Sequence, residues 1–315
     1  MNFENYFSTN LFSKIFLNPI EKIFHDKKNN LLSYQYNRNM SNYHKEQSLG
    51  SGGFSVVDLC SVKAETSFAE KGALVAVKRI EDVENVVKAK HEAEILIKLT
   101  HRFIVKYLDN FQDSCGRFCI VLEYCDVGTI KDWLRGQEPV GEGSIWRAIW
   151  QLSSALTFLH GQNPPILHND LKPSNILCKT ASSSGHIDMK IADFGLSDIL
   201  GSTPSATYYT TPNPSGFTWT YASPEVLRNE SHVTTSSDMW SLGAVIAFIA
   251  NDMTHLFDSK EEIMDWTGQE SPLDREFKYE ELHTLVLSLL APDKHLRPTA
   301  EEILQDCSDH PERYW

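Results

Sequence analysis

Residues 166–177 of the chain read Ile166-Leu167-His168-Asn169-Asp170-Leu171-Lys172-Pro173-Ser174-Asn175-Ile176-Leu177. An apolar pair at each end flanks a polar run, which predicts two short strands joined by a tight loop. The loop contains a His, two Asn, an Asp and a Lys, side chains that can orient a hydroxyl, neutralise a phosphate and hold a metal ion. A further apolar run, residues 189–192, precedes Asp193-Phe194-Gly195. Both segments are candidates for the functional site.

The 315-residue chain has the composition of a globular protein with a marked negative charge. Hydrophobic residues make up 41% and charged residues 23%, and the length allows one large domain or two lobes with their own cores. The formal net charge of −13 at pH 7 argues against nucleic acid or an anionic membrane as the main partner, because both are polyanions. No run approaches the ~18 apolar residues that a membrane-spanning helix needs.

The six cysteines favour reduced thiols over a disulfide framework or a zinc site. None of them forms a Cys-x-x-Cys pair, and no His lies beside them at zinc-finger spacing. The first residues of the chain lack the basic segment and apolar core of a signal peptide. We therefore expect a cytoplasmic protein, with the nucleus as an alternative.

Residues 1–43 differ from the rest and are predicted to form an N-terminal extension, partly helical or disordered. Apolar residues recur at helical spacing between Leu11 and Phe24, with Pro19 as an interruption. Lysines lie between them, so contact with a membrane surface stays open, although packing on the domain or disorder is the preferred interpretation.

Three further segments have patterns that suit nucleotide binding. Residues 49–57 predict a strand, a glycine-rich turn and a second strand, and glycine lets backbone N–H groups approach a phosphate closely. Residues 73–80 alternate like a strand that carries Lys78 near its end. Residues 83–99 have a helical pattern, and strands are expected near residues 104–107 and 118–122.

In this order the segments resemble the landmarks of a eukaryotic-type protein kinase of the serine/threonine class. Residues 168–175 are similar to the catalytic loop and residues 193–195 to the metal-binding loop of that family. Residues 50–57 follow the pattern G-x-G-x-x-G-x-V, with Ser55 in place of the third glycine. The resemblance extends over residues 44–311.

The resemblance implies an α+β, bilobal protein kinase fold. The N-lobe, residues 44–122, would be a small antiparallel sheet with one main helix. A hinge at residues 123–128 would lead to a mainly helical C-lobe, residues 129–311. Within that lobe, residues 144–160 show the apolar periodicity of a long buried helix.

The resemblance also implies the chemistry of the catalytic loop, which is transfer of a phosphoryl group from ATP. Asp170 would accept or orient the proton of a substrate hydroxyl, and Lys172 would neutralise charge on the γ-phosphoryl group. Asn175 and Asp193 would bind Mg²⁺, which prefers hard oxygen ligands. The partners would be proteins with Ser or Thr acceptors.

By the same resemblance, Lys78 would hold the α- and β-phosphates of ATP and pair with a carboxylate on the next helix. Helical spacing places Glu92 on the same face as Leu96, while Glu94 points to solvent, so Glu92 is the expected partner. The residues expected around the nucleotide are Leu49, Gly50, Ser51, Gly52, Gly53, Phe54, Ser55, Val56, Val57, Ala76, Lys78, Glu92, Leu122 as gatekeeper, Glu123, Cys125 and Leu177. The resemblance implies that Glu123 and Cys125 bind adenine through backbone groups.

Three landmarks lie further along the chain. Glu225 follows Pro224 in the segment that resembles A-P-E, and its expected partner is Arg297. Asp238 matches the residue that braces the catalytic loop. Lys172 together with Thr218 points to Ser and Thr rather than Tyr as acceptors.

Two other function classes are alternatives to an active protein kinase. A catalytically inactive kinase fold that serves as a binding scaffold usually lacks one of the key residues. Lys78, Glu92, Asp170, Asn175 and Asp193 are all present. A kinase-like enzyme that acts on small molecules is disfavoured by the Thr218 and Glu225 segments, which belong to protein-directed kinases.

The catalytic loop departs from the family pattern at Asn169, where most kinases have Arg. That Arg commonly pairs with a phosphate on the activation loop, and Asn carries no charge with which to do so. The corresponding segment, residues 196–217, is rich in hydroxyl groups that could be phosphorylated: Ser202, Thr203, Ser205, Thr207, Tyr208, Tyr209, Thr210 and Thr211.

We therefore expect phosphorylation of this segment to be dispensable for catalysis. Phosphatase-treated protein should keep its rate of phosphoryl transfer, because Asn169 has no charge with which to form an ion pair with a phosphate on this segment. A complete loss of rate after phosphatase treatment would contradict the hypothesis.

Overall fold

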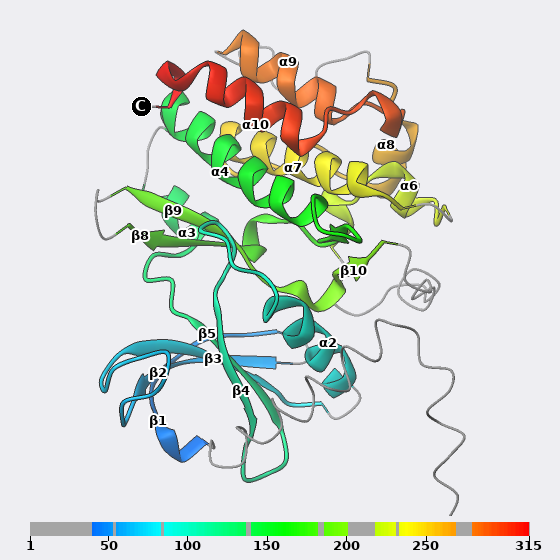
Figure 1. Ribbon diagram of the computed structural model, residues 1–315. Coiled ribbons are helices and arrows are strands. Elements are labelled where there is room, and N and C mark those ends of the chain that lie inside the picture. Colours follow the sequence, from blue (N-terminus) through cyan, green and yellow to red (C-terminus); the bar gives the residue numbers. More distant parts are fainter. Residues whose placement is uncertain are drawn as a thin grey trace, which may run out of the picture.

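The alternating residues of 73–80 form β3 (Leu74–Ile80), the central strand of a five-stranded antiparallel sheet at one end of the molecule (Figure 1). The other strands are β1 (Tyr43–Ser51), β2 (Ser55–Val62), β4 (Tyr107–Gln112) and β5 (Phe118–Glu123), and their order across the sheet is β1-β2-β3-β5-β4. This sheet is the body of the N-lobe, and the predicted strand at residues 118–122 is confirmed as β5.

The computed structural model describes residues 40–52, 55–82, 85–136, 140–181, 186–200, 218–230, 233–268 and 279–314. The expectations for residues 1–39, for Gly53 and Phe54, and for the hydroxyl residues between 202 and 211 lie outside these ranges. Tyr43, the last residue assigned to the extension, starts β1, and its buried ring stacks on Phe111 with the ring centroids 5.3 Å apart.

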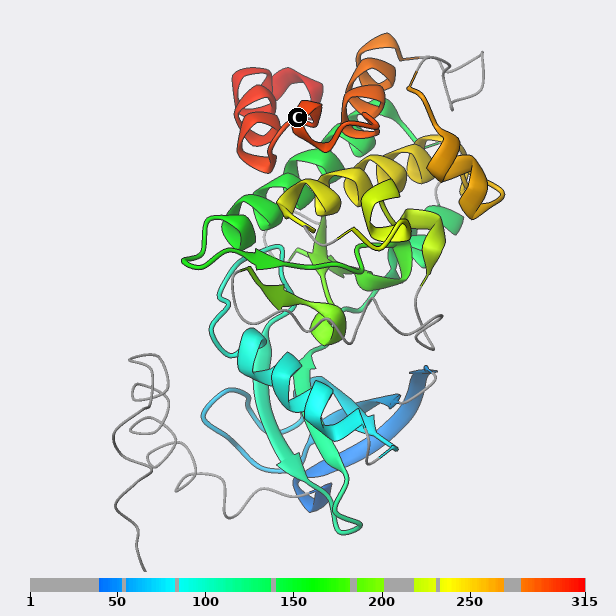
Figure 2. The same ribbon diagram turned by 90° about the vertical axis from the view of Figure 1, so that its right-hand side faces the viewer.

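Helix α2 (Val86–Leu96) lies against the sheet and within the predicted range 83–99 (Figure 2). Its buried residues include Glu92, which is only 2% exposed, whereas Glu94 is exposed. The helical spacing thus assigned the two carboxylates to the correct faces, because a three- to four-residue repeat keeps Glu92 on the side of Leu96.

The prediction of a strand at residues 104–107 is wrong, because β4 starts only at Tyr107. Ile104 makes a single parallel bridge with Ile191, and the Val105 amide donates to the Ile191 carbonyl at 2.9 Å. Both side chains at 104 and 105 are buried, since this segment runs between the lobes rather than along one face of a sheet. Consecutive apolar residues do not distinguish the two situations.

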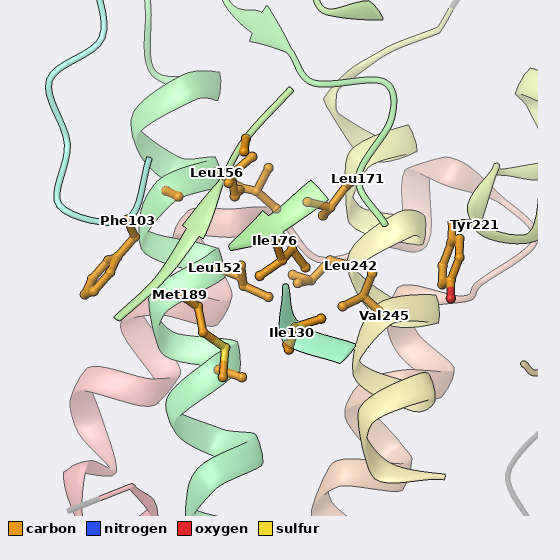
Figure 3. Close-up of a cluster of buried hydrophobic side chains, with 14 of the residues drawn as sticks. Phe103, Ile130, Leu152, Leu156, Leu171, Ile176, Met189, Tyr221, Leu242 and Val245 are labelled. Atoms are coloured by element: carbon orange, nitrogen blue, oxygen red, sulfur yellow. The ribbon is translucent and has the colours of Figure 1, made fainter. Parts of the chain in front are cut away.

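The long helix predicted at residues 144–160 is confirmed as α4 (Glu142–His160), and its apolar face is buried throughout. Figure 3 shows Leu152 and Leu156 from α4 and Leu242 and Val245 from α7 (Thr235–Ala250) converging around Ile176. The other α-helices of the described C-lobe are α3 (Ile130–Arg135), α6 (Pro224–Leu227), α8 (Lys260–Asp265), α9 (Glu280–Leu289) and α10 (Ala300–Asp309).

Short strands lie between these helices and the N-lobe sheet (Figure 1). The loop at residues 168–175 runs from β7 (Ile166–Leu167) to β8 (Ile176–Thr180), so the predicted strand–loop–strand is confirmed. The remaining strands are β6 (Gly128–Thr129), β9 (Ile187–Ile191) and β10 (Asp198–Ile199), arranged in the sheets β6-β8-β9 and β10-β7. Short 3₁₀ helices span Met40–Asn42, Pro173–Asn175, Phe194–Leu196, Trp219–Tyr221, Lys294–Leu296 and Pro311–Arg313.

The molecule therefore has the expected bilobal α+β architecture. A small antiparallel sheet with one α-helix among its described residues faces a lobe built mainly of helices (Figures 1 and 2). Within the described ranges, no helix has both the length and the apolar character needed to cross a membrane.

A buried ion pair joins two distant parts of the C-lobe, as the resemblance implied. The Arg297 guanidinium contacts both Glu225 carboxylate oxygens, at 2.6 and 2.9 Å, and both residues are at most 5% exposed. Ser237 Oγ donates to the same carboxylate at 2.9 Å, and the guanidinium lies 5.1 Å from the centroid of the Trp240 ring. The pair connects the first turn of α6 to the chain leading into α10.

We expect Glu225→Gln to destabilise the protein by about 3–5 kcal/mol, the cost typical of leaving one buried charge without its partner. Urea unfolding followed by circular dichroism would measure the loss of unfolding free energy. Glu301→Gln, at an exposed carboxylate of α10, is the matched control and should change stability by less than about 0.5 kcal/mol. Equal unfolding free energies of the two variants would contradict the expected cost of breaking the Glu225–Arg297 ion pair.

Candidate active site

Two side chains of the catalytic loop, those of Asn175 and Lys172, contact the Asp170 carboxylate. The Asn175 amide donates to Asp170 Oδ2 at 2.9 Å and to the Asp170 carbonyl at 2.9 Å. Lys172 Nζ lies 2.8 Å from Asp170 Oδ2 and 3.3 Å from Thr218 Oγ1. Burial raises the pKa of Asp170, and the charge of Lys172 opposes the rise. The loop thus presents a partly desolvated carboxylate with a cation beside it.

The backbone of this loop is held by Asp238 at the start of α7. The amides of His168 and Asn169 each donate to one Asp238 oxygen at 2.9 Å, and His160 Nε2 lies 2.9 Å from the same carboxylate. Asp238 is only 1% exposed, and burial favours its neutral form. These hydrogen bonds nevertheless hold its pKa below the usual range. Asp238 therefore occupies the bracing position that the resemblance implied.

His168 orders the loop rather than facing the reacting groups. It is fully buried, its Nε2 lies 3.1 Å from the Ala192 carbonyl, and its ring packs edge-on against Phe194. The Asp170 amide donates to His168 Nδ1 at 3.4 Å. These contacts leave no ring nitrogen for proton transfer to a substrate.

Lys78 of β3 connects the N-lobe to the segment after β9. Its Nζ lies 2.8 Å from both Glu92 carboxylate oxygens and 2.8 Å from Asp193 Oδ1. Burial alone would lower the pKa of Lys78, but the two carboxylates raise it above the ordinary value. The charge of Lys78 in turn lowers the pKa of Asp193 to about 2. At neutral pH, Lys78 is a cation and Asp193 an anion.

Backbone hydrogen bonding links the two proposed metal ligands. The Ala192 amide, next to Asp193, donates to the Asn175 carbonyl at 2.8 Å. Asn175 donates through its side-chain N–H groups to Asp170, so its amide oxygen is the atom suited to a metal. Asp193 binds Lys78 through one oxygen, which leaves its second oxygen for a cation.

These donors fit Mg²⁺, which is typically bound by one or two protein oxygens while keeping waters and phosphates. In the described ranges, no group of three or more His, Cys, Asp and Glu side chains is arranged around a common metal position. A metal at Asn175 and Asp193 would therefore take its remaining ligands from phosphate and water.

The glycine-rich turn joins β1 to β2, and β2 pairs with β3, the strand that carries Lys78. A Cβ at Gly50 would meet no atom within 4 Å, and at Gly52 it would meet only Ser55, at 3.9 Å or more. Packing of the described residues therefore does not demand glycine at either position. Open glycines suit a turn whose N–H groups approach a ligand.

The residues expected around the base come from both lobes. Ala76 on β3 and Leu122 on β5 are directly paired and are both 8% exposed. Glu123 ends β5, Cys125 follows in the hinge, and Leu177 lies on β8. Of the turn residues, Leu49, Gly50 and Ser51 end β1, Gly52 follows it, and Ser55, Val56 and Val57 begin β2.

Two features of the site did not follow from the motif alone. Asn169 has a positive φ of 63° and donates through Nδ2 to the Leu196 carbonyl at 3.1 Å. Asn is among the residues that best tolerate this left-handed conformation, so its identity was an available signal. Phe194 is fully buried against His168, and its neighbour Asp193 also has a φ of 63°.

Comparison with known proteins identifies the family. The family model "Protein kinase domain" matches residues 43–307. Serine/threonine-protein kinase Nek11 of Homo sapiens is 33% identical over 84% of this chain, and Nek8 of Danio rerio is 31% identical over 84%. The probable serine/threonine-protein kinase zyg-1 of Caenorhabditis briggsae is 30% identical over 66% of the chain. The alignments cover 40%, 36% and 26% of these three relatives, respectively. The chain belongs to the protein kinase family.

Proposed function

We propose that the protein is an ATP-dependent protein kinase that transfers the γ-phosphoryl group to Ser and Thr hydroxyls of proteins. The observation that carries this proposal is the contact of Lys78 with Glu92 and Asp193, beside the Asp170–Lys172–Asn175 group. Use of ATP is a property of the family to which the chain belongs. The names of the relatives, which are serine/threonine-protein kinases, support the acceptor type.

The residues divide the work of phosphoryl transfer between binding and positioning. ATP with Mg²⁺ supplies the transferable phosphoryl group and a cation that neutralises its charge. Lys78, kept protonated by Glu92, would hold phosphate oxygens, and Asn175 and Asp193 would provide oxygen ligands for the metal. The glycine-rich turn between β1 and β2 would contribute backbone N–H groups toward the phosphates.

Asp170 orients the acceptor hydroxyl and receives its proton as the hydroxyl oxygen bonds to the γ-phosphorus and the bond from that phosphorus to the departing ADP oxygen breaks. A raised pKa improves a carboxylate as a base, and burial gives Asp170 such a shift. Lys172 Nζ lies beside Asp170 and stabilises the negative charge of the phosphoryl group during transfer. Its contact with Thr218 supports a Ser or Thr acceptor, since both residues belong to the pattern that distinguishes these kinases.

We further propose residues 44–311 as the catalytic domain, residues 1–43 as an extension and the cytoplasm or nucleus as the location. All six cysteines are free, and five are buried, which supports a reducing compartment. Protein substrates are the proposed partners.

Substitution of Asp170 separates catalysis from nucleotide binding. Asp170→Asn should lower kcat by about 10²- to 10⁴-fold, because it removes the base while its shape remains. Nucleotide binding should persist in this variant. Transfer of labelled phosphate from ATP to generic protein substrates, and titration calorimetry with ATP and Mg²⁺, would measure the two properties.

Glu94→Gln is the control, because this carboxylate lies on α2 and points to solvent. It should keep wild-type activity. Wild-type protein that binds ATP without transferring phosphate would favour a non-catalytic scaffold. Transfer to small molecules alone would favour the third function class.

A further inference from the structure

We infer that Glu123 is a positioning residue for the nucleotide base, acting through its side-chain carboxylate. The carboxylate fixes the start of the hinge, residues 123–128, to the β8–β9 pair of the C-lobe. This inference rests on the proposed function, because it concerns the site at which ATP would bind.

The Glu123 carboxylate has three partners and is nearly buried. Its Oε1 accepts a hydrogen bond from the Lys106 amide at 2.8 Å and lies 2.9 Å from Lys190 Nζ. Its Oε2 lies 2.8 Å from Lys179 Nζ. The side chain is only 12% exposed, so all three contacts operate with little water around the carboxylate.

One of these contacts alters the backbone hydrogen-bonding pattern at the end of β5. The Glu123 amide donates to the Lys106 carbonyl at 2.9 Å, as in a regular antiparallel ladder. In a continued ladder the Lys106 amide would donate to the Glu123 carbonyl, but it donates to the carboxylate instead. The side chain thus replaces the Glu123 carbonyl, which is one of the backbone groups expected to bind adenine.

The two lysines share a face with the expected floor of the base site. Lys190 on β9 is the direct cross-strand partner of Leu177 on β8, and Lys179 lies two residues after Leu177. Directly paired residues, and residues two apart, point to the same side of a sheet. Cys178 and Met189, on the opposite side, are buried in the main hydrophobic core (Met189 is labelled in Figure 3). The face with Leu177 therefore also holds both charges that anchor Glu123.

Lys190 holds the Glu123 carboxylate in place, because its own ammonium group is buried and has a second partner. It is 7% exposed, and its Nζ also donates to the Arg102 carbonyl at 2.5 Å. A buried ammonium without a carboxylate is costly, so Lys190 requires Glu123 as much as Glu123 requires Lys190.

The other end of the hinge is tied to β8 independently. The Thr180 amide donates to Asp126 Oδ1 at 2.8 Å, and the Val127 amide donates to the Cys178 carbonyl at 3.2 Å. Gly128 then pairs with Cys178 in the sheet. Glu123 secures the N-lobe end of the same segment, so the backbone between Glu123 and Asp126 is held at both ends by contacts with the β8–β9 pair.

Adenosine tests this role because it contains the base and no phosphate, and its binding does not depend on Lys78 or on a metal. Titration calorimetry should show that Glu123→Ala weakens adenosine affinity by about fivefold or more, since a displaced hinge lowers the fraction of binding-competent protein. The KM for ATP should rise in parallel, with kcat within about twofold of wild type. Glu94→Ala, an exposed carboxylate on α2, is the matched control and should bind adenosine like wild type.

A double-mutant cycle distinguishes positioning from general destabilisation. Lys179→Ala should weaken adenosine binding less than Glu123→Ala, because Lys190 remains, and the double variant should be no weaker than Glu123→Ala. If Glu123→Ala does not fold by circular dichroism, Glu123→Gln keeps the side-chain shape while removing its charge, and should show the same direction of change.

Adenosine affinity of the folded Glu123 variant within about twofold of wild type would overturn the inference, and so would additive effects of the two substitutions. Wild-type protein that binds neither ATP nor adenosine would overturn the proposed function as well. Wild-type binding with no effect at Glu123 would remove this inference alone.

Discussion

The contact of Lys78 with Glu92 and Asp193 is the interaction on which the arrangement of the two lobes around the site depends. It brings together the central strand of the N-lobe sheet, its helix α2 and the segment that follows β9 in the C-lobe. Each partner is local to a different element, so the ion cluster forms only when β3, α2 and the end of β9 are all in place. The same charges that hold the lobes together are those that would meet phosphate and metal.

Elsewhere the fold satisfies its buried charges in pairs that set geometry. Asp238 accepts two backbone amides of the catalytic loop, and Glu225 accepts both arms of the Arg297 guanidinium. Desolvation consumes much of the attraction within such pairs, so their net contribution to stability is small even though breaking one is costly. Their structural consequence is orientation: the Asp238 hydrogen bonds hold the backbone on which Asp170 is mounted.

The β8–β9 pair has a comparable organising role for the hinge. One of its faces supplies core residues against α4, and the other carries Leu177, Lys179 and Lys190 toward the N-lobe. Because one rigid hairpin contributes to both surfaces, the expected floor of the base site and the anchors of the hinge cannot move independently. The catalytic loop precedes β8 directly, and Asp193 follows β9 after one residue. The residues expected to meet the base and the metal are therefore carried by one hairpin and the loops beside it.

Local periodicity in the sequence was sufficient for the elements whose neighbours lie within the same segment. The buried face of α4 and the choice of Glu92 over Glu94 follow from a spacing of three to four residues. The strands around the catalytic loop follow from the apolar pairs that flank its polar run. The order of the motifs was sufficient for the family, because each lies at its characteristic place in the chain.

Only the tertiary structure decided features that depend on residues far apart in the chain. The sequence of residues 104–105 predicts a strand. In the fold this segment instead bridges to Ile191 at the end of β9 and is buried between the lobes. In the sequence, Asn169 shows only that the positive charge of the usual Arg is absent. In the fold it adopts a left-handed backbone conformation and donates a hydrogen bond to the Leu196 carbonyl. Glu123 reads as an ordinary hinge residue, and its carboxylate gains meaning only from Lys179 and Lys190. Sequence spacing records the repeat of one helix or strand, whereas these contacts depend on how separate elements pack together.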